Sequence, residues 1–400
     1  MKKYVIIGNS TAAIGCVEGI RSVDSEGSIT LIASEPHHTY SRPLISYLLY
    51  GKTTEELMKY RPDDFYEANK VETKLGVTVT SLDPEKKTVL TDEGETIKYD
   101  ELMVATGSRP FVPPFNGLDK IEKKFSFMTL DDAHSLQSVL NPEAKVLVVG
   151  AGLIGLKCVE GILDRVASVT VTDLADRILP SILDIDASQR VQRFLEDKGV
   201  KFLLNNSVEE FGSNSCKMKN GETVNYDIVV LAVGVRPNIS LVQDAGGETA
   251  RGIVIDDHCK TTLENVYAAG DCTVGFAILP NAYMEGHTAG VNMAGGDAIF
   301  NDLFPMNAIG FFGLHIITAG FYQGECYEAI SEDNYKKLFY QDNRLSGFIL
   351  IGNVANAGIY TSLLRNKTPL DAIDFELIKE KPQLMAFTKA DRAKKLAEPH

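Results

Sequence analysis

The sequence predicts an α/β fold with two parallel, doubly wound sheets and a smaller α+β domain at its C-terminal end. An apolar strand, a glycine-containing turn and a helix occur in this order twice, with Gly8 and Gly150 at equivalent positions 142 residues apart. In each copy a further strand follows the helix, and this alternation is typical of parallel sheets. After about residue 300 the alternation ends, and two apolar, β-rich runs follow one another directly.

The first unit starts with the apolar residues 4–7, which are too few for a secretory signal or a membrane span and are typical of a buried strand. A glycine turn at residues 8–13 and a helix follow, and a strand at residues 29–32 leads to Glu35. Ser10 and Ala13 replace the second and third glycines of the Gly-x-Gly-x-x-Gly pattern. Alanine is an accepted variant at the third position, and the Ser10 hydroxyl can donate a hydrogen bond to a phosphate oxygen.

The second unit carries the complete Gly-x-Gly-x-x-Gly pattern at residues 150–155, between a strand at 146–149 and a helix. The first glycine permits the tight turn, the second lets the backbone approach a pyrophosphate, and the third lets helix and strand pack closely. A strand at residues 169–172 ends at Asp173, an acid placed to accept hydrogen bonds from ribose hydroxyls. Because this acid repels a 2′-phosphate, the pattern predicts NADH in preference to NADPH. Arg177 lies close enough in sequence to weaken this preference, because its positive charge could attract the 2′-phosphate.

The last hundred residues predict a domain of a different type. Two strands at residues 335–340 and 345–351, separated by Asp342 and Asn343, are typical of an antiparallel hairpin. A helix is expected at residues 356–365. Together these elements predict a domain of α+β type.

The composition is that of a globular protein with an acidic surface. Hydrophobic residues make up 44% and charged residues 24% of the 400 residues, which excludes disorder and coiled coil. The net charge of -14 argues against nucleic-acid binding and against an anionic membrane surface. The six cysteines have no paired or metal-type spacing, so we expect no metal site and buried, reduced thiols in a cytoplasmic protein.

Three further segments, each after an expected strand, carry a resemblance. They read Ala-Thr-Gly-Ser-Arg-Pro at residues 105–110, Ala-Val-Gly-Val-Arg-Pro-Asn at 232–238 and Asn-Val-Tyr-Ala-Ala-Gly-Asp-Cys at 265–272. With both glycine turns, their order resembles the pyridine nucleotide-disulfide oxidoreductase superfamily of flavoproteins over roughly residues 1–300. This resemblance implies two Rossmann-like domains that bind FAD and NADH. The implied boundaries are 1–110 and 237–300 for the FAD domain, 111–236 for the NADH domain and 301–400 for the C-terminal domain.

The resemblance also implies which positions lie at the cofactors. At FAD it places Gly8, Ser10, Thr11, Ala12, Ala13, Glu35, Arg42, Pro43, Ala105, Thr106, Gly107, Gly270, Asp271, Pro280 and Ala282. At NADH it places Gly150, Gly152, Leu153, Ile154, Gly155, Asp173, Val233 and Gly234. The helix that starts near Pro280 would point its N-terminus at the pyrimidine edge of the flavin.

The branch of the superfamily that the chain resembles is indicated by the absence of one cysteine. Disulfide, peroxide and coenzyme A-disulfide reductases carry their redox thiol in the region that reads here as residues 40–49, which contain no cysteine. Arg42-Pro43 followed by Ser46, together with residues 345–352, instead resembles the branch of NADH:rubredoxin oxidoreductases, ferredoxin reductases and the NADH-dehydrogenase part of nitrite reductases. That branch implies hydride transfer from NADH to flavin N5 and electron transfer to an iron–sulfur partner such as rubredoxin or a ferredoxin-like subunit. The resemblance also allows a complex with carbon monoxide dehydrogenase, and electron flow in reverse, from the iron–sulfur partner to NAD. The reaction requires no catalytic side chain beyond the flavin.

Two departures from the branch concern the flavin–nicotinamide site. Relatives commonly carry lysine at the position of Tyr47 and glutamate at the position of Lys157. Lys157 is therefore either a solvated helix residue or a change that weakens nicotinamide docking.

Two alternative functions stay open at this point. One is an NADH oxidase or coenzyme A-disulfide reductase, against which the missing cysteine counts. The other is a flavin-binding subunit of a larger complex without nicotinamide turnover. An acidic iron–sulfur partner would need a local basic face, and the sequence offers two basic clusters, which more commonly are solvated surface charge: Lys120, Lys123 and Lys124 in one, Lys336 and Lys337 in the other.

Overall fold

The computed structural model of the chain describes residues 1–301 and 304–387. The chain divides into two compact units, a larger one of Met1–Leu174 with Lys201–Leu303 and a smaller one of Ala175–Val200 with Phe304–His400. No helix in the described ranges is long and apolar enough to cross a membrane.

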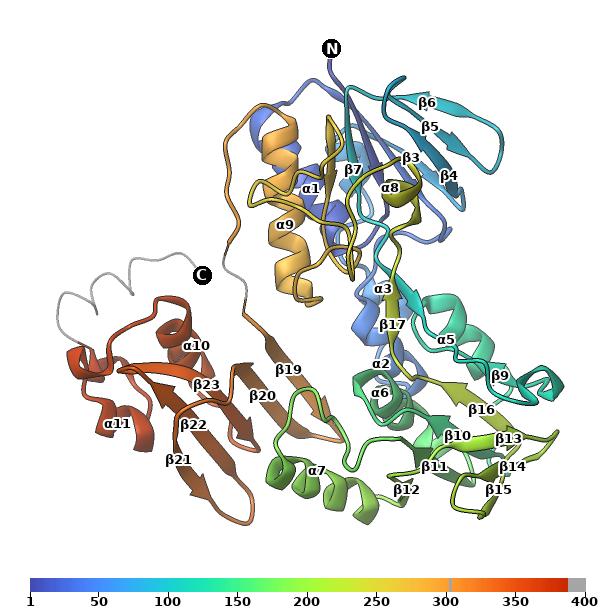
Figure 1. Ribbon diagram of the computed structural model, residues 1–400, viewed down its shortest axis with the longest axis vertical. Coiled ribbons are helices and arrows are strands. Elements are labelled where there is room, and N and C mark those ends of the chain that lie inside the picture. Colours follow the sequence, from blue (N-terminus) through green and yellow to red (C-terminus); the bar gives the residue numbers. More distant parts are fainter. Residues whose placement is uncertain (302–303, 388–400) are drawn as a thin grey trace. The chain divides into compact units, whose positions relative to one another are not determined.

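The first sheet of the larger unit is parallel, with the strand order β18-β7-β1-β2-β3. Its strands are β1 (Lys3–Ile7), β2 (Ser28–Ala33), β3 (Val71–Leu75), β7 (Glu101–Val104) and β18 (Val266–Ala268). Helices α1 (Thr11–Val23) and α9 (Leu279–Met293) lie side by side against it (Figure 1). Glycines make this close packing possible, since a Cβ at Gly15 would lie 2.4 Å from the carbonyl oxygen of Tyr283 and one at Gly290 would lie 2.2 Å from that of Cys16.

The second sheet repeats the plan, with the order β12-β11-β10-β16-β9 and parallel pairing between β10 and both of its neighbours. Its strands are β9 (Lys124–Phe125), β10 (Lys145–Val149), β11 (Ser168–Thr172), β12 (Val200–Leu203) and β16 (Ile228–Leu231). Helix α6 (Leu153–Ile162) follows the second glycine turn, and α5 (Leu130–Gln137) starts with a capping box formed by Thr129 and Asp132. Both strand–turn–helix units are therefore confirmed.

Small antiparallel sheets and short helices complete the larger unit. The sheets are β4 (Val79–Asp83) with β5 (Thr88–Thr91) and β6 (Thr96–Lys98), β13 (Val208–Phe211) with β14 (Ser215–Met218) and β15 (Thr223–Asn225), and β8 (Ser108–Pro110) with β17 (Val235–Pro237). The short helices are α2 (Ile45–Leu49), α3 (Glu55–Met58), α4 (Phe65–Ala68) and α8 (Ser240–Asp244). The expected boundaries between the FAD and NADH domains fall on the β8–β17 ribbon, and the three-domain division stays a prediction.

The smaller unit has an antiparallel sheet with the order β19-β20-β23-β22-β21. Its strands are β19 (Met306–Phe311), β20 (Leu314–Gly320), β21 (Glu325–Ile330), β22 (Tyr335–Gln341) and β23 (Arg344–Ile351), and its helices include α10 (Ala357–Arg365) and α11 (Phe375–Glu380). Apolar side chains of β22, β23 and α10 form its core, including Leu338, Phe348 and Leu363. The expected hairpin and helix are confirmed, and so is the α/β fold class.

Helix α7 (Ile185–Asp197) belongs to the smaller unit, although it lies within the segment that the sequence assigns to the NADH domain. The buried Lys337 of β22 forms ion pairs of 3.0 Å with Asp184 and Asp186 at the start of α7 and with Glu328. Burial works against the charge, but these partners raise the pKa of Lys337 overall. No apolar periodicity could reveal this attachment, because it rests on ionic contacts between segments about 150 residues apart.

Candidate dinucleotide sites

The three glycines of the second turn have different structural roles. Gly150 has φ of +117°, and a Cβ there would lie 2.1 Å from the carbonyl oxygen of Ala232. A Cβ at Gly155 would lie 2.1 Å from the carbonyl oxygen of Gly150. Gly152, the N-cap of α6, has no atom within 4 Å of its Cβ position. The first and third glycines are thus required by packing, whereas the second leaves open space where a pyrophosphate would approach the helix start.

Asp173 stabilises this turn through a hydrogen bond to its backbone. Its Oδ2 accepts a hydrogen bond of 2.7 Å from the backbone N–H of Ala151. Gly234, which follows β16, has φ of +111° and open space at its Cβ position. The sequence interpretation gave Asp173 a ribose as its partner, and it missed that the same carboxylate also holds the turn.

The first glycine turn has the same plan with different residues. Gly8 has φ of +124°, and a Cβ there would lie 2.3 Å from the carbonyl oxygen of Ala105. Ser10 is the N-cap of α1, but its side chain accepts no capping hydrogen bond. Ala13 is fully buried, so the turn accommodates its methyl group. The Ser10 hydroxyl is therefore not committed to the helix and stays a predicted phosphate donor.

A network of three side chains follows β2. The two carboxylate oxygens of Glu35 accept hydrogen bonds of 2.6 Å from the guanidinium of Arg42 and of 2.6 Å from the hydroxyl of Tyr40. Arg42 also donates to the carbonyl oxygen of Met128 at 2.9 Å. Glu35 and Arg42, which the sequence interpretation placed separately at FAD, are thus joined to each other. Tyr40 was missed, although it stands two residues before Arg42.

The segments after β7 and β18 meet at the partly buried carboxyl group of Asp271. Asp271 accepts a hydrogen bond of 3.3 Å from the Ser108 hydroxyl, and burial raises the pKa of this carboxyl. Thr106 and Asn238 exchange two hydrogen bonds of 2.8 and 2.9 Å. Gly107 has φ of +61° and no atom within 4 Å of its Cβ position. A partly buried acid beside an open glycine fits a polyhydroxyl chain, which can donate hydrogen bonds to the acid.

The remaining predicted positions lie at or beside these two turns. Thr11 and Ala12 form the first turn of α1, and Leu153 and Ile154 that of α6. Pro280 and Ala282 lie in the first turn of α9. Pro43 lies in the 3-10 turn that leads into α2, and Val233 precedes Gly234 after β16. The roles of all these residues stay predictions.

Lys157 is not a solvated helix residue. Its side chain is 19% exposed and forms an ion pair with Glu160, one turn further along α6. The Lys157 ammonium lies 4.4 Å from the ring centroid of Tyr47 on α2, which is a cation–π distance. The two departures noted in the sequence therefore lie in contact with each other.

The cysteines offer no reactive thiol next to either turn. Five of them are buried, and burial raises the pKa of their thiols; they are Cys16, Cys158, Cys216, Cys259 and Cys272. The expectation of buried thiols is wrong for Cys326, which is exposed on β21. All six are free cysteines in the part of the chain that the structure describes.

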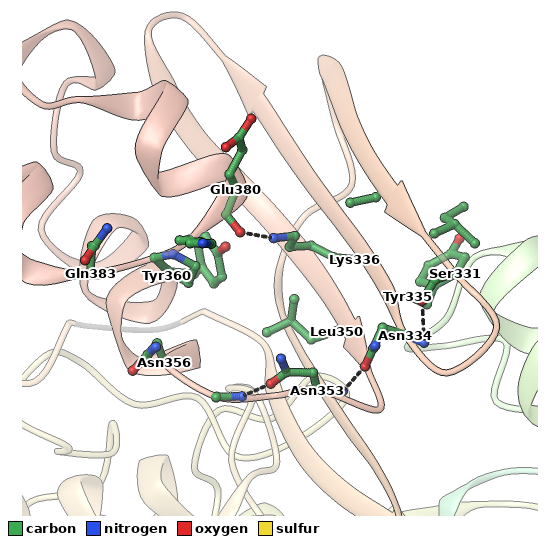
Figure 2. A pocket seen from close by; sticks show the side chains of 15 residues that line it. Ser331, Asn334, Tyr335, Lys336, Leu350, Asn353, Asn356, Tyr360, Glu380 and Gln383 are labelled. Atoms are coloured by element: carbon green, nitrogen blue, oxygen red, sulfur yellow. Dashed lines mark hydrogen bonds between the residues drawn. The ribbon is translucent and has the colours of Figure 1, made fainter.

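A pocket of about 610 Å³ lies in the smaller unit, away from both glycine turns in the sequence (Figure 2). Its polar side chains are largely engaged in the fold: the ammonium of Lys336 donates to the carbonyl oxygens of Lys379 and Glu380, and the Asn334 side chain accepts from the Asn353 backbone. Lys336 and the buried Lys337 therefore offer no basic docking face. The preferred interpretation of this cluster, solvated surface charge, is wrong for Lys337. In the other cluster Lys120 pairs with Glu210 at 3.5 Å, which leaves docking there a prediction.

An acidic loop is the one group in the described residues that has the composition of a metal site. The carboxylates of Asp256 and Asp257 lie close to His258. The imidazole is already held between Asp257 at 2.8 Å and Asp297 at 3.0 Å. Nothing else marks this exposed loop as a cation site.

Comparison with known proteins gives the following relationships. The family model described as pyridine nucleotide-disulphide oxidoreductase matches residues 2–286, and that of the rubredoxin NAD+ reductase C-terminal domain matches residues 305–368. The chain is 30% identical to the NADH-dependent phenylglyoxylate dehydrogenase subunit epsilon of Aromatoleum evansii, over 92% of each protein. It is 26% identical to the NADH-rubredoxin oxidoreductase of Clostridium acetobutylicum, over 88% of this chain and 92% of that one.

Two further relatives, each 30% identical, are longer proteins, of which the chain spans 48% and 50%. Among solved structures, the covalent complex of putidaredoxin reductase with putidaredoxin matches with a TM-score of 0.88 at 22% identity, over 99% of each chain. At this identity the likeness concerns the fold alone.

Proposed function

The chain belongs to the pyridine nucleotide-disulphide oxidoreductase family, and from this membership we propose that it is an NADH:acceptor oxidoreductase that delivers electrons to an iron–sulfur protein. As a member of the family it is a flavin-dependent oxidoreductase that uses NAD(H). The proposal goes further in naming the direction and the acceptor. Two observations together support it. Both glycine turns leave a helix start open to a pyrophosphate, and residues 40–49 contain no cysteine.

Different residues of the larger unit hold the two cofactors. The start of α1 and the Gly8 turn bind one pyrophosphate, while Asp271 accepts hydrogen bonds from the adjoining ribityl chain. The Gly150 turn and the start of α6 bind the other pyrophosphate, and Asp173 accepts from the adenosine ribose and holds the turn in place. FAD, when bound, supplies the chemistry by accepting a hydride from NADH and releasing electrons singly.

The missing thiol argues against the competing enzymatic function. Disulfide reduction needs a reactive cysteine beside the flavin, and thiolates form where burial is incomplete and a positive charge is near. Here the described cysteines near the glycine turns, Cys16 and Cys158, are buried on α1 and α6 and have raised pKa values. An acceptor on a separate protein is therefore the better account of where the electrons go.

Two relationships support an iron–sulfur acceptor. Residues 305–368 match the C-terminal domain of rubredoxin NAD+ reductase, and the chain covers almost the whole NADH-rubredoxin oxidoreductase of C. acetobutylicum. Rubredoxin or a ferredoxin-like subunit is accordingly the acceptor that we propose.

An anaerobic titration of the purified chain with NADH tests the proposal. We expect the yellow flavin absorbance to bleach at about one equivalent of NADH, faster than with NADPH, and to recover when oxidised rubredoxin or ferredoxin is added. A flavin that NADH does not bleach would contradict the NADH-dependent function. Recovery only with oxygen or a disulfide, accompanied by peroxide or free thiol, would favour the oxidase or disulfide reductase instead.

A further inference from the structure

A carboxyl group that the sequence analysis did not consider is buried next to the first glycine turn. Glu285 on α9 is 2% exposed. Its Oε2 accepts a hydrogen bond of 2.7 Å from the backbone N–H of Gly270 and one of 3.5 Å from the Thr273 hydroxyl. One carboxyl group therefore ties α9 to the loop that carries Asp271.

The same part of α9 packs against the phosphate-binding start of α1. A Cβ at Gly286 would lie 1.9 Å from the carbonyl oxygen of Ala12, and one at Gly270 would lie 3.2 Å from the Ala12 Cβ. Ala12 lies in the first turn of α1, where backbone N–H groups are free to bind a pyrophosphate. Negative charge bound at that turn thus arrives close to a buried carboxyl group.

No cation in the described part of the chain forms an ion pair with Glu285. The ionisable groups that face it are the carboxyl group of Asp271 and the thiols of Cys259 and Cys272, and none of these is positively charged. Burial is the main reason that the pKa of Glu285 rises to about 7, and Asp271 raises it further, against the effect of the Gly270 and Thr273 hydrogen bonds.

The charged groups on the other elements packed against α9 are engaged elsewhere. On α1, Glu18 accepts hydrogen bonds from Arg61 and Tyr283. Arg21, the cation of α1, donates to the backbone carbonyl oxygens of Asn69 and Gly27. On β7, Glu101 pairs with Lys2 at 3.1 Å. Strand β18, which also packs against α9, contributes a tyrosine and no charge. Nothing on these elements offsets a negative charge at Glu285.

We propose that Glu285 is a positioning residue that holds the Gly270 loop as a neutral acid, and that FAD binding is accompanied by uptake of one proton at its carboxyl group. This inference rests on the proposed FAD-dependent function. Like charges disfavour ionisation, so the bound pyrophosphate favours the protonated acid. The proton comes from solvent: the FAD-free chain with Glu285 ionised combines with FAD and one proton to give the complex, and no electrons move.

The sign of the pH dependence follows from linkage. As pH rises above about 7, the FAD-free chain loses this proton before the complex does. FAD affinity therefore falls with rising pH, by up to about tenfold per pH unit while only the complex holds the proton. A permanently neutral side chain removes this dependence.

Calorimetric titration of FAD into the full chain stripped of its flavin tests the inference, in two buffers of different ionisation enthalpy at about pH 8. We expect close to one proton taken up per FAD in the wild type. Glu285→Gln keeps an accepting oxygen, and we expect it to bind FAD without proton uptake and with an affinity that does not vary with pH. Glu18→Gln is the matched control, because it also removes a carboxylate that contacts α9, and we expect it to retain the wild-type proton uptake.

The outcomes separate the inference from the function on which it rests. A wild-type chain that binds FAD without proton uptake overturns the inference, and so does Glu285→Gln with undiminished uptake. A chain that binds no FAD overturns the proposed function instead. Should Glu285→Gln not fold, the infrared C=O band of a protonated carboxylic acid in the wild-type FAD complex decides: present at neutral pH and lost in alkali supports the inference, absent at both overturns it.

Discussion

The two glycine-turn units share the pentapeptide Cys-Val-Glu-Gly-Ile, on α1 at residues 16–20 and on α6 at residues 158–162, yet its two glutamates lie in different surroundings. Glu18 is bound by groups from other segments, the guanidinium of Arg61 at 2.7 Å and the hydroxyl of Tyr283 at 2.6 Å. Glu160 is 2% exposed and pairs with Lys157 on its own helix. The difference teaches that a repeated segment retains its backbone geometry while each copy acquires its own electrostatic partners.

The glycine of the pentapeptide, in contrast, has the same role in both copies. A Cβ at Gly19 would lie 2.3 Å from the carbonyl oxygen of His287 on α9, and one at Gly161 would lie 2.9 Å from that of Ser46 on α2. In each unit the glycine lets a second helix pack closely against the helix that follows the turn. Helix packing thus explains why Gly19 and Gly161 are equivalent, without any role in cofactor binding.

The largest expected effect separates the packing glycine of the second turn from its ligand-facing glycine. Gly150→Ala places a Cβ 2.1 Å from a carbonyl oxygen at a positive φ, and we expect it to cost about 4 kcal/mol of unfolding free energy. Gly152→Ala has open space and an extended backbone, so we expect near wild-type stability with NADH binding lost. Urea unfolding and NADH titration measure the two effects. Equal stability of the two variants would contradict this division of roles.

A smaller effect compares the equivalent glutamates. Glu160→Gln leaves the Lys157 ammonium largely buried beside a neutral group, so we expect a loss of about 3 kcal/mol in unfolding free energy. Glu18→Gln weakens partly exposed hydrogen bonds to Arg61 and should cost only about 1 kcal/mol. Urea unfolding of both variants at neutral pH measures these losses. If Glu18→Gln lost as much unfolding free energy as Glu160→Gln, the surroundings of the two glutamates would not determine the size of the loss.

The Glu18 effect should also vanish in acid. Burial opposes its charge, but the hydrogen bonds from Arg61 and Tyr283 lower the pKa of Glu18 below its ordinary value of 4.5. A lowered pKa contributes stability that is present above the unfolded value and is lost as pH falls through the folded one. The difference between wild type and Glu18→Gln should therefore shrink below about pH 4.5, and a constant difference would rule out this linkage.

The smallest effect concerns the contact between Lys157 and Tyr47. The sequence interpretation places Lys157 near the nicotinamide, where a cation would oppose the positive charge that the ring gains as the hydride leaves. On that prediction, Lys157→Glu should speed anaerobic flavin reduction by NADH by about fivefold, or about 1 kcal/mol. Lys157→Arg retains the cation and the contact with Tyr47 and is the control. Flavin content checks that both variants fold. An unchanged Michaelis constant and rate in Lys157→Glu would remove Lys157 from the nicotinamide site.

Much of the fold could be predicted because it depends on local patterns. The strands predicted at residues 4–7 and 146–149 coincide with β1 and β10 except for the first residue of each strand, since short apolar runs before glycine turns leave little choice. The helix after each turn was likewise confirmed. The grouping of α7 with the C-terminal strands was not foreseen, because it depends on ion pairs of Lys337 with residues distant in sequence.

The candidate site was predictable to the same extent and for the same reason. Gly8, Gly150 and Gly155 are required by the path of the backbone, so their roles could be read from spacing alone. Side-chain partners could not be read in this way. The bond from Tyr40 to Glu35 and the burial of Glu285 at Gly270 both join segments whose contact depends on the folded chain.

The sequence by itself determined the fold class, the family and the two dinucleotide turns, since each is written in short patterns of apolar, glycine and acidic residues. The tertiary structure alone decided which charges are neutralised. Lys337 is buried among three acids, Lys157 lies over Tyr47, and Glu285 has no cationic partner among the residues that the structure describes. The physical reason is that hydrophobic periodicity and backbone sterics act over a few residues, whereas desolvation and ion pairing depend on groups that only the folded chain brings together.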